Sequence, residues 1–335
     1  MSAKPRSATQ VMFGFDFQSN AAIILMIDNM SELSTIRIEG EEDIEIMLSD
    51  GSFVLAQAKS VVHSSTDFSN VRAKAKKALE SLSEAAKKLK ASELVYITNS
   101  PDPLKDRASR TMFIGPSRVS YDNLPPKTQR IISDYLSQIQ APLDTTRLRI
   151  QVIPFETDDD QQRYKVVLEH ISDFIGTLEL DAPGLKKRLH EVWQMMLDKN
   201  GTKADRDIKL TKKDVIWPII VFVTGRGQLK REAQYCTDLD DSDFDEVERR
   251  YGEIIEDYSE RYEIVIKVIS AFVEKNLRGR DAIVSFVNEN WEPYVELFGL
   301  RTVEEPIQSN LTKIILYTIL SKRREINKIK QAVNL

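Results

Sequence analysis

The sequence predicts an α/β domain followed by a mainly α-helical domain, and two observations support this division. Up to Phe155, segments with helical spacing of apolar residues alternate with short segments typical of strands. After the acidic turn at residues 158–160, almost all of the periodicity is helical. A chain of 335 residues is long enough for two domains. We therefore expect one domain over residues 1–156 and a second over 157–335.

The expected elements of the first domain follow the order helix, hairpin, helix and strand. They are a helix over 13–30, strands over 36–48 and 52–59, a helix over 70–90 and a strand over 94–98. The hairpin turn is expected at Ser49-Asp50-Gly51. Prolines interrupt residues 116–146, where only a helix over 128–139 is expected, and a further strand is expected over 148–155. The pattern favours a mixed sheet flanked by helices.

The second domain is expected to be a bundle of helices. The main candidates are residues 163–178, 183–197, 244–277 and 311–333. The apolar run 216–223 contains Pro218 and predicts a buried strand, with a turn at Gly225-Arg226-Gly227. Residues 262–273 and 311–320 are apolar around much of a helix, so they must be buried in their own bundle or against a partner.

Composition excludes several classes of protein. A single cysteine, Cys236, leaves no internal disulfide and no thiolate zinc site, and the three histidines are widely scattered. The net charge of −5 does not suggest a protein that coats DNA, although an active site that holds a cation can itself be acidic. No apolar run approaches the length of a membrane span, and no signal peptide is expected. We expect a cytoplasmic protein without a membrane partner.

The first hairpin carries acidic residues in alternation. Ile36, Ile38, Ile44, Ile46 and Leu48 are expected on one face, and Glu39, Glu41, Asp43 and Glu45 on the other. A plain two-residue turn at Asp50-Gly51 would place Asp43 opposite Ala58. A three-residue loop with Gly51 in the left-handed conformation instead pairs Asp43 with Gln57 and Glu41 with Lys59. We predict this bulged turn, since it brings a carboxylate, an amide oxygen and an ammonium together.

These groups suit phosphodiester hydrolysis. A hard cation, Mg²⁺ or Mn²⁺, is held by oxygen ligands and activates water. Asp43 would be the principal ligand, and the side-chain oxygen of Gln57 and the carbonyl of Ala58 would be weaker ones. Lys59 would orient or deprotonate the attacking water and stabilise charge on the phosphoryl oxygens. The alternative for such an alternating segment is a solvated acidic face opposite a packed one.

The wider pattern resembles the PD-(D/E)XK nuclease superfamily. It runs GFDFQ at 14–18, Glu39-x3-Asp43-Ile44, AQAK at 56–59, a Lys/Ala-rich helix, and VYITNS at 95–100. This string is most similar to the double-stranded-DNA nuclease domain of bacterial antiphage effectors, found in SAVED-linked CBASS effectors, in Lamassu-type systems and beside hexameric motor ATPases. The resemblance covers roughly residues 12 to 155 and implies a restriction-endonuclease-like fold.

The resemblance also implies roles for individual residues. The metal-binding acid falls on Asp43, the Q-x-K pair on Gln57 and Lys59, the helix-borne glutamine on Gln18 and the upstream glutamate on Glu39. Many members of the superfamily have an acid where Gln57 stands, so tight cation binding in this chain would need a DNA phosphate as a further ligand. Basic residues outnumber acidic ones on the helix over 70–90, which is either a solvated face or a surface that neutralises phosphates.

The resemblance implies a nuclease effector in an antiphage defence complex. The helical second domain would then be an adaptor toward an ATPase partner of SMC/ABC type or a hexameric motor. Cutting both DNA strands needs two sites, so a homo-oligomer is expected. Two alternatives stay open: a catalytically silent, nuclease-like adaptor that binds DNA or a partner, and a stand-alone restriction-type endonuclease.

Overall fold

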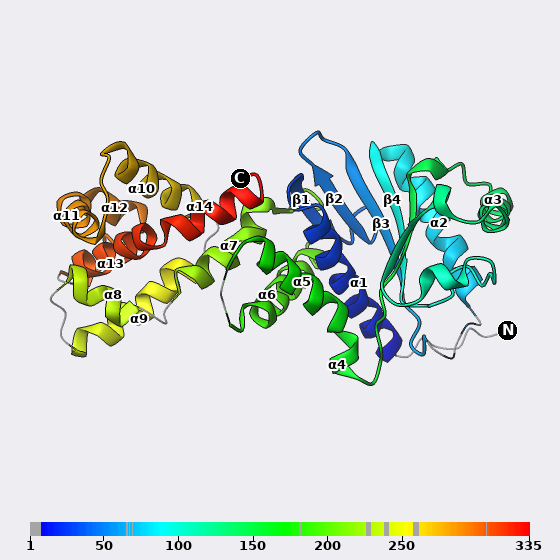
Figure 1. The fold of residues 1–335 in the computed structure, drawn as a ribbon, viewed down its shortest axis with the longest axis horizontal. Helices are drawn as coiled ribbons and strands as arrows, with labels where there is room; N and C mark the ends of the chain where they lie inside the picture. Colours follow the sequence, from blue (N-terminus) through cyan, green and yellow to red (C-terminus); the bar gives the residue numbers. More distant parts are fainter. Residues whose placement is uncertain are drawn as a thin grey trace. The chain divides into compact units, whose positions relative to one another are not determined.

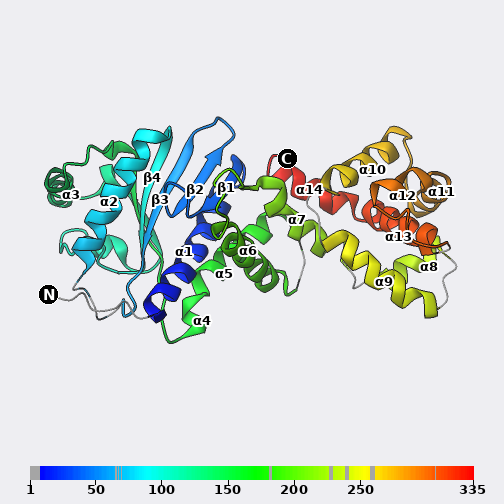
Figure 2. The ribbon, with the colours of Figure 1, turned by 180° about the vertical axis from the view of Figure 1, so that it is seen from behind.

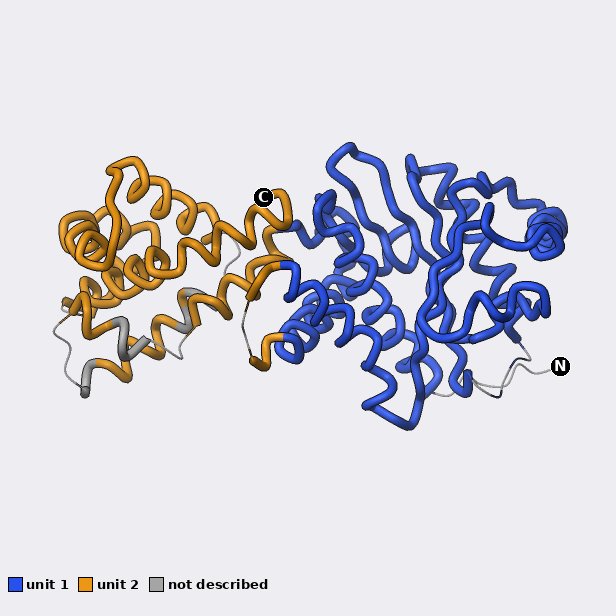
Figure 3. Tube along the Cα trace, viewed as in Figure 1, with its two compact units in different colours: residues 1–177, 186–212 blue, residues 178–185, 213–335 orange. Residues whose placement is uncertain are grey.

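The computed structural model describes residues 8–64, 66, 68, 70–180, 183–225, 229–237, 241–256, 261–305 and 307–335. The chain divides into two compact units, the first formed by residues 1–177 with 186–212 and the second by residues 178–185 with 213–335 (Figure 3). The division falls later than the boundary expected after residue 156. Helix α5 (Lys165–Thr177) packs along α1 (Ala8–Asp28), which makes it part of the first unit.

A seven-stranded sheet forms the centre of the first unit, in the order β5-β6-β4-β3-β2-β1-β7. The strands are β1 (Leu33–Ile38), β2 (Ile44–Leu48), β3 (Phe53–Lys59), β4 (Ala91–Thr98), β5 (Ser117–Ser120), β6 (Leu148–Val152) and β7 (Leu210–Thr211). Strands β1, β2 and β3 form an antiparallel meander, whereas β3, β4 and β6 run parallel to one another. The sheet is therefore mixed, as the sequence predicts.

Helices cover this sheet (Figure 1). The remaining α-helices of the unit are α2 (Val71–Lys88), α3 (Pro126–Ile139), α4 (Asp160–Arg163) and α6 (Leu185–Gly201), and short 3₁₀ turns lie at Arg110–Phe113, Tyr121–Asn123 and Thr145–Arg147. Helix α1 packs against β1, β2 and β3, and α2 connects β3 to the parallel β4. Helix α1 is long and apolar enough to cross a membrane, but 61% of its most apolar window is buried in the structure, as in the core helix of a folded unit.

The two faces of β3 serve different cores. Leu55 belongs to a hydrophobic core with Leu79 and Leu82 of α2 and with Tyr96 of β4. Successive side chains of a strand point to opposite faces, so Val54 and Ala56 lie on the other face. Both are almost fully buried. By the same alternation, Gln57 and Lys59 share the face of Leu55, the one that α2 covers.

The second unit is a bundle of helices, as predicted. Beyond α7 (Lys212–Val223), which begins at the last residue of the first unit, its helices are α8 (Leu229–Cys236), α9 (Asp241–Glu256), α10 (Tyr262–Glu274), α11 (Arg280–Asn290), α12 (Glu292–Leu297), α13 (Ile307–Ser321) and α14 (Arg323–Ala332). Helix α13 contacts α8 to α12 and α14 (Figure 2). Every residue of 311–320 except Lys313 is buried. The apolar segment 311–320 is therefore buried within its own bundle.

Two expectations about elements are wrong. Residues 36–48 form two antiparallel strands rather than one, with a loop over 39–43 between them. The run 216–223 lies in helix α7, which contains Pro218 in its interior, and not in a strand. A short apolar run does not distinguish a buried strand from a buried helix by periodicity alone. Residues 226 and 227 of the expected turn lie outside the described residues.

Candidate active site

The turn between β2 and β3 sets which side chains meet. Gly51 has a φ of 77°, a left-handed conformation that favours glycine, and its N–H donates to the carbonyl of Leu48 at 3.0 Å. The N–H of Leu48 donates to the carbonyl of Ser52 at 2.8 Å, which closes a three-residue loop. The ladder then pairs Ile44 with Ala56. Its continuation places Asp43 opposite Gln57, so the predicted bulged register is confirmed.

Strand β2 begins at Ile44, so the ladder of β2 and β3 ends just before the positions of Asp43 and Gln57. Residues 39–43 form a loop, in which the N–H of Glu39 donates to the carbonyl of Asp43 at 3.1 Å. The expected pairing of Glu41 with Lys59 is therefore wrong. Glu41 instead pairs with Lys88 of α2 and accepts from Nη1 of Arg206 at 3.0 Å. The ladder of β2 and β3 ends at the pair Ile44–Ala56, so Glu41 lies beyond it.

Asp43 and Lys59 nevertheless meet. Lys59 Nζ lies 3.1 Å from Oδ2 of Asp43, and the same oxygen accepts from the N–H of Ala58 at 2.9 Å. The two side chains keep 22% and 28% of their surface exposed, so the pair opens to solvent. Oδ1 of Asp43 accepts no hydrogen bond from the described residues. This oxygen is therefore available to a cation or to water.

Gln18 holds the loop from the side of α1. Its Nε2 donates to Oε1 of Glu39 at 2.8 Å and to the carbonyl of Asp43 at 2.7 Å. Gln18 is 6% exposed, and Glu39 has a φ of 57°, which is uncommon for a residue other than glycine. The amide thus fixes the backbone that carries Asp43. Gln18 and Glu39 are brought together as expected, with Gln18 in a positioning contact.

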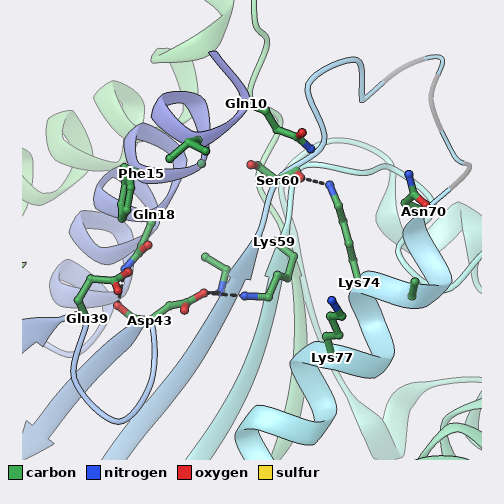
Figure 4. Close-up of a pocket in the computed structure, with 14 residues that line it drawn as sticks. Gln10, Phe15, Gln18, Glu39, Asp43, Lys59, Ser60, Asn70, Lys74 and Lys77 are labelled. Atoms are coloured by element: carbon green, nitrogen blue, oxygen red, sulfur yellow. Dashed lines mark hydrogen bonds and ion pairs between the residues drawn. The ribbon is translucent and has the colours of Figure 1, made fainter. Parts of the chain in front are cut away.

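A cavity of about 570 Å³ opens over Asp43 and Lys59 (Figure 4). Its lining comes from α1, the loop over 39–43, the end of β3 and the start of α2: Gln10, Val11, Gly14, Phe15, Gln18, Glu39, Asp43, Ala58, Lys59, Ser60, Asn70, Ala73, Lys74 and Lys77. Two carboxylates and three ammonium groups face this space. Lys74 also donates to the carbonyl of Ser60. Such a mixture of charges suits an anionic substrate that arrives with a cation.

The two predicted weaker ligands, Gln57 and Ala58, differ in whether they reach the cavity. Ala58 lines the cavity, whereas Gln57 does not and is only 3% exposed. Gln57 pairs with Tyr96 in the parallel ladder of β3 and β4. The structure thus brings together Asp43, Lys59, Ala58, Glu39 and Gln18 around one cavity, and leaves Gln57 beside it. Among the described residues, no group of three or more His, Cys, Asp or Glu side chains is positioned to hold a metal ion.

Sequence reasoning missed Glu42. This side chain is 4% exposed, and neither carboxyl oxygen has a hydrogen-bond partner. Burial, reinforced by the neighbouring charge of Asp43, raises the pKa of Glu42 to about 8. The alternation of the segment makes Glu42 an interruption of the apolar face, so the pattern alone assigns it no role. Its position directly before Asp43 was the available signal.

Comparisons with known proteins leave the family open. No protein-family model matches the chain, and no curated protein matches it either. The chain aligns with the Cap4 SAVED/CARF-domain containing receptor of Moraxella osloensis with a TM-score of 0.40 and 16% identity, over 77% of this chain and 60% of that one.

A second receptor shows a similarly low likeness. The Acinetobacter baumannii Cap4 SAVED/CARF-domain containing receptor with the cyclic trinucleotide 3'3'3'-cAAA aligns with a TM-score of 0.37 and 15% identity, over 62% of this chain and 44% of that one. The structure of the same receptor with 2'3'3'-cAAA aligns with a TM-score of 0.37 and 16% identity, over 65% of this chain and 45% of that one. The chain spans less than two thirds of the length of each of these structures.

Proposed function

We propose that this chain is a metal-dependent endonuclease that cuts double-stranded DNA, with its active site at the end of β3. The observation that carries the proposal is the 3.1 Å contact between Lys59 Nζ and Asp43 Oδ2 inside a cavity lined by Lys74 and Lys77. The order of elements in the first unit supports it, because the resemblance places the acid and the Q-x-K strand on a hairpin between two helices, and β2 and β3 lie between α1 and α2.

The donor set fits a hard divalent cation, Mg²⁺ or Mn²⁺. Asp43 offers Oδ1, and Glu39 adds a second carboxylate to the lining of the cavity. A Mg²⁺ site commonly uses one or two carboxylates and completes its shell with water and substrate phosphate. When bound, the cation polarises the phosphate and lowers the pKa of its water.

The chain's own groups supply the rest of the chemistry. Lys59 is the one ammonium at hydrogen-bonding distance from Asp43 among the described residues, so it can orient the attacking water and stabilise charge on the phosphoryl oxygens. Lys74 and Lys77 line the approach to this point and would neutralise phosphates of the bound strand. Gln18 holds the carbonyl of Asp43 and therefore the direction of its carboxylate.

The wider role we propose is that of an effector subunit in a bacterial antiphage defence complex. The motifs around Gln18, Asp43 and Lys59 support this assignment by their resemblance to antiphage effector nucleases. The helical second unit would attach the nuclease to an ATPase partner of SMC/ABC type or to a hexameric motor. A homo-oligomer would supply the two sites that a double-strand cut needs.

The experiment is cleavage of supercoiled plasmid by the full chain, with Mg²⁺ or Mn²⁺ and with EDTA. Asp43→Asn and Lys59→Ala should each lower the rate by about 10²-fold or more, the contribution typical of a positioned acid–base group. The control Lys87→Ala lies at the far end of α2, where Lys87 pairs with Glu84, and should keep the wild-type rate. Linear product in excess of nicked product would indicate that two sites act together.

The main competing function is a catalytically silent adaptor that binds DNA. The burial of Gln57 outside the cavity favours it, because one expected metal ligand is not in place. Absence of cleavage by the chain alone and with its operon partners, together with DNA binding that Asp43→Asn leaves unchanged, would establish the adaptor. Cleavage by the chain alone at full rate would instead indicate a stand-alone restriction-type enzyme.

A further inference from the structure

Three phenylalanines lie at alternate positions of α1 and face two different sides of it. Phe13 and Phe17 are 5% and 0% exposed, and the ring of each lies 5.4 Å from the ring of Phe155. Two positions along a helix turn the side chain by about 200°, so Phe15 points away from this core. Its side chain is 51% exposed. A large aromatic ring is therefore held out of the hydrophobic core.

The exposed ring of Phe15 belongs to the wall of the cavity at the end of β3. Residues of α1 that line the cavity are three or four positions apart and so share one face of the helix: Val11, Gly14, Phe15 and Gln18. Lys74 and Lys77 of α2 line the opposite side (Figure 4). The cavity thus has an aromatic side and a cationic side.

Gly14 leaves room beside the ring of Phe15. Among the described residues, a Cβ at this position would meet only Oγ of Ser60, at 3.9 Å, which is an ordinary van der Waals distance. The packing of these residues therefore does not require a glycine, although glycine inside a helix is less stable than alanine. A flat group that lies along the ring would occupy this room.

We propose that Phe15 stacks on a nucleobase of the DNA strand whose phosphate is bound at Lys59. The inference rests on the proposed function and adds the state of the substrate, because the stacked base must be separated from its neighbours in the duplex. A nucleotide combines a flat base with an anionic phosphate, which matches the two sides of the cavity. Stacking on aromatic side chains is a common way to hold bases of a single strand, and apolar wedges unstack bases in a duplex.

The test measures binding of two labelled single-stranded oligonucleotides of equal length to the full chain. Fluorescence anisotropy is recorded in EDTA, so that no cleavage takes place. One oligonucleotide carries all its bases, and the other has abasic positions in its central part, so the two share their phosphates and differ in their bases. The wild type should bind the first about fivefold or more tightly, which is the lower end of what one stacked base contributes.

Substitutions at Phe15 assign this preference to the ring. Phe15→Leu should lose most of the preference for the complete oligonucleotide, and Phe15→Trp should keep it, because the larger ring still stacks. Lys77→Gln should weaken binding of both oligonucleotides by the same factor, since it removes a contact with phosphate. Met12→Ala is the matched control: Met12 is 72% exposed on the same helix but does not line the cavity, and its variant should keep the wild-type preference.

Folding is checked by melting temperature. The variants at positions 12 and 15 should melt within about 2 °C of the wild type, because substitutions of exposed residues change stability little. Equal binding of the two oligonucleotides by the wild type, or a preference that Phe15→Leu retains, would overturn the inference and leave the nuclease assignment intact. The exposed face of α1 would then be a surface for a protein partner. No binding of either oligonucleotide or of a duplex by the wild type would overturn the proposed function as well.

Discussion

Lys59 Nζ and Asp43 Oδ2 lie 3.1 Å apart although 16 positions separate the two residues in sequence. The contact exists because one glycine turns the chain between β2 and β3 with the register that alternation requires. A shift of one residue would move every side chain of β2 to the opposite face of the sheet.

Gly51 should be needed for the cation site as well as for stability. Gly51→Val places a β-branched residue at a φ of 77° and should cost about 1–2 kcal/mol in the free energy of unfolding. Strain in this turn also weakens the register that places Asp43 opposite Gln57 and close to Lys59. Stabilisation by Mn²⁺, measured as a rise in melting temperature, should therefore be reduced.

Gly115 provides the control. It has a φ of 72°, and a side chain there would also meet no atom within 4 Å. Gly115→Val should show a similar loss of stability, but it should keep the response to Mn²⁺. Equal responses in the two variants would show that the turn does not set the geometry of the site.

Lys77 should contribute one phosphate contact. Its exposed side chain lines the cavity on the first turns of α2. Lys77→Gln should weaken duplex binding and reduce the slope of log K against log salt by about 0.9. Fluorescence anisotropy of a labelled duplex over a salt series measures this. Lys87→Gln, on the same helix, should leave the slope unchanged, and an equal effect of both variants would indicate nonspecific attraction to the whole helix.

His190 should make the first unit sensitive to mild acid. Burial lowers the pKa of His190 below its ordinary value of 6.5, and its Nε2 lies 2.7 Å from Oδ1 of Asn20. The unfolded chain takes up a proton near that value and the folded chain only at a lower pH. The free energy of unfolding therefore falls as the pH drops through this window, by up to about 1.4 kcal/mol per pH unit.

Chemical denaturation at pH 7.5 and at pH 5.5 measures this loss. His190→Gln cannot take up the proton, so the difference between the two pH values should shrink in the variant. His170, whose pKa is raised by its hydrogen bond to Asp28, acts in the opposite direction and is unchanged in both proteins. A difference that stays the same in the variant would show that another group titrates.

The sequence predicted most of the candidate site because its determinants are local. The conformation of Gly51 and the alternation along β3 depend on neighbouring residues, and they were sufficient to place Asp43 near Lys59. Helix α2 was equally predictable, since its apolar spacing is regular over Val71–Lys88. The pairing of β1 with β2 was missed, because the loop over 39–43, with Gly40 and four acidic residues, lies inside an alternating pattern.

What could not be predicted depends on contacts between distant residues. Gln57 alternates in phase with Lys59, yet it is only 3% exposed, whereas Lys59 at the end of the strand opens into the cavity. The run 216–223 is helical and mostly buried, and a short apolar pattern does not distinguish a buried helix from a buried strand. Glu42 required the structure, since a carboxyl group without a partner can be recognised only when its surroundings are known.

Three consecutive side chains of α1 connect the loop that carries Asp43 to helix α6. Gln18 holds the carbonyl of Asp43, Ser19 donates to Oδ1 of Asp198 at 2.5 Å, and Asn20 bonds to His190, the last two partners belonging to α6. A rotation or translation of α6 would therefore displace Ser19 and Asn20, which are adjacent to Gln18. Movement of α6 would therefore be transmitted along α1 to the loop that carries Asp43, without any change inside the cavity.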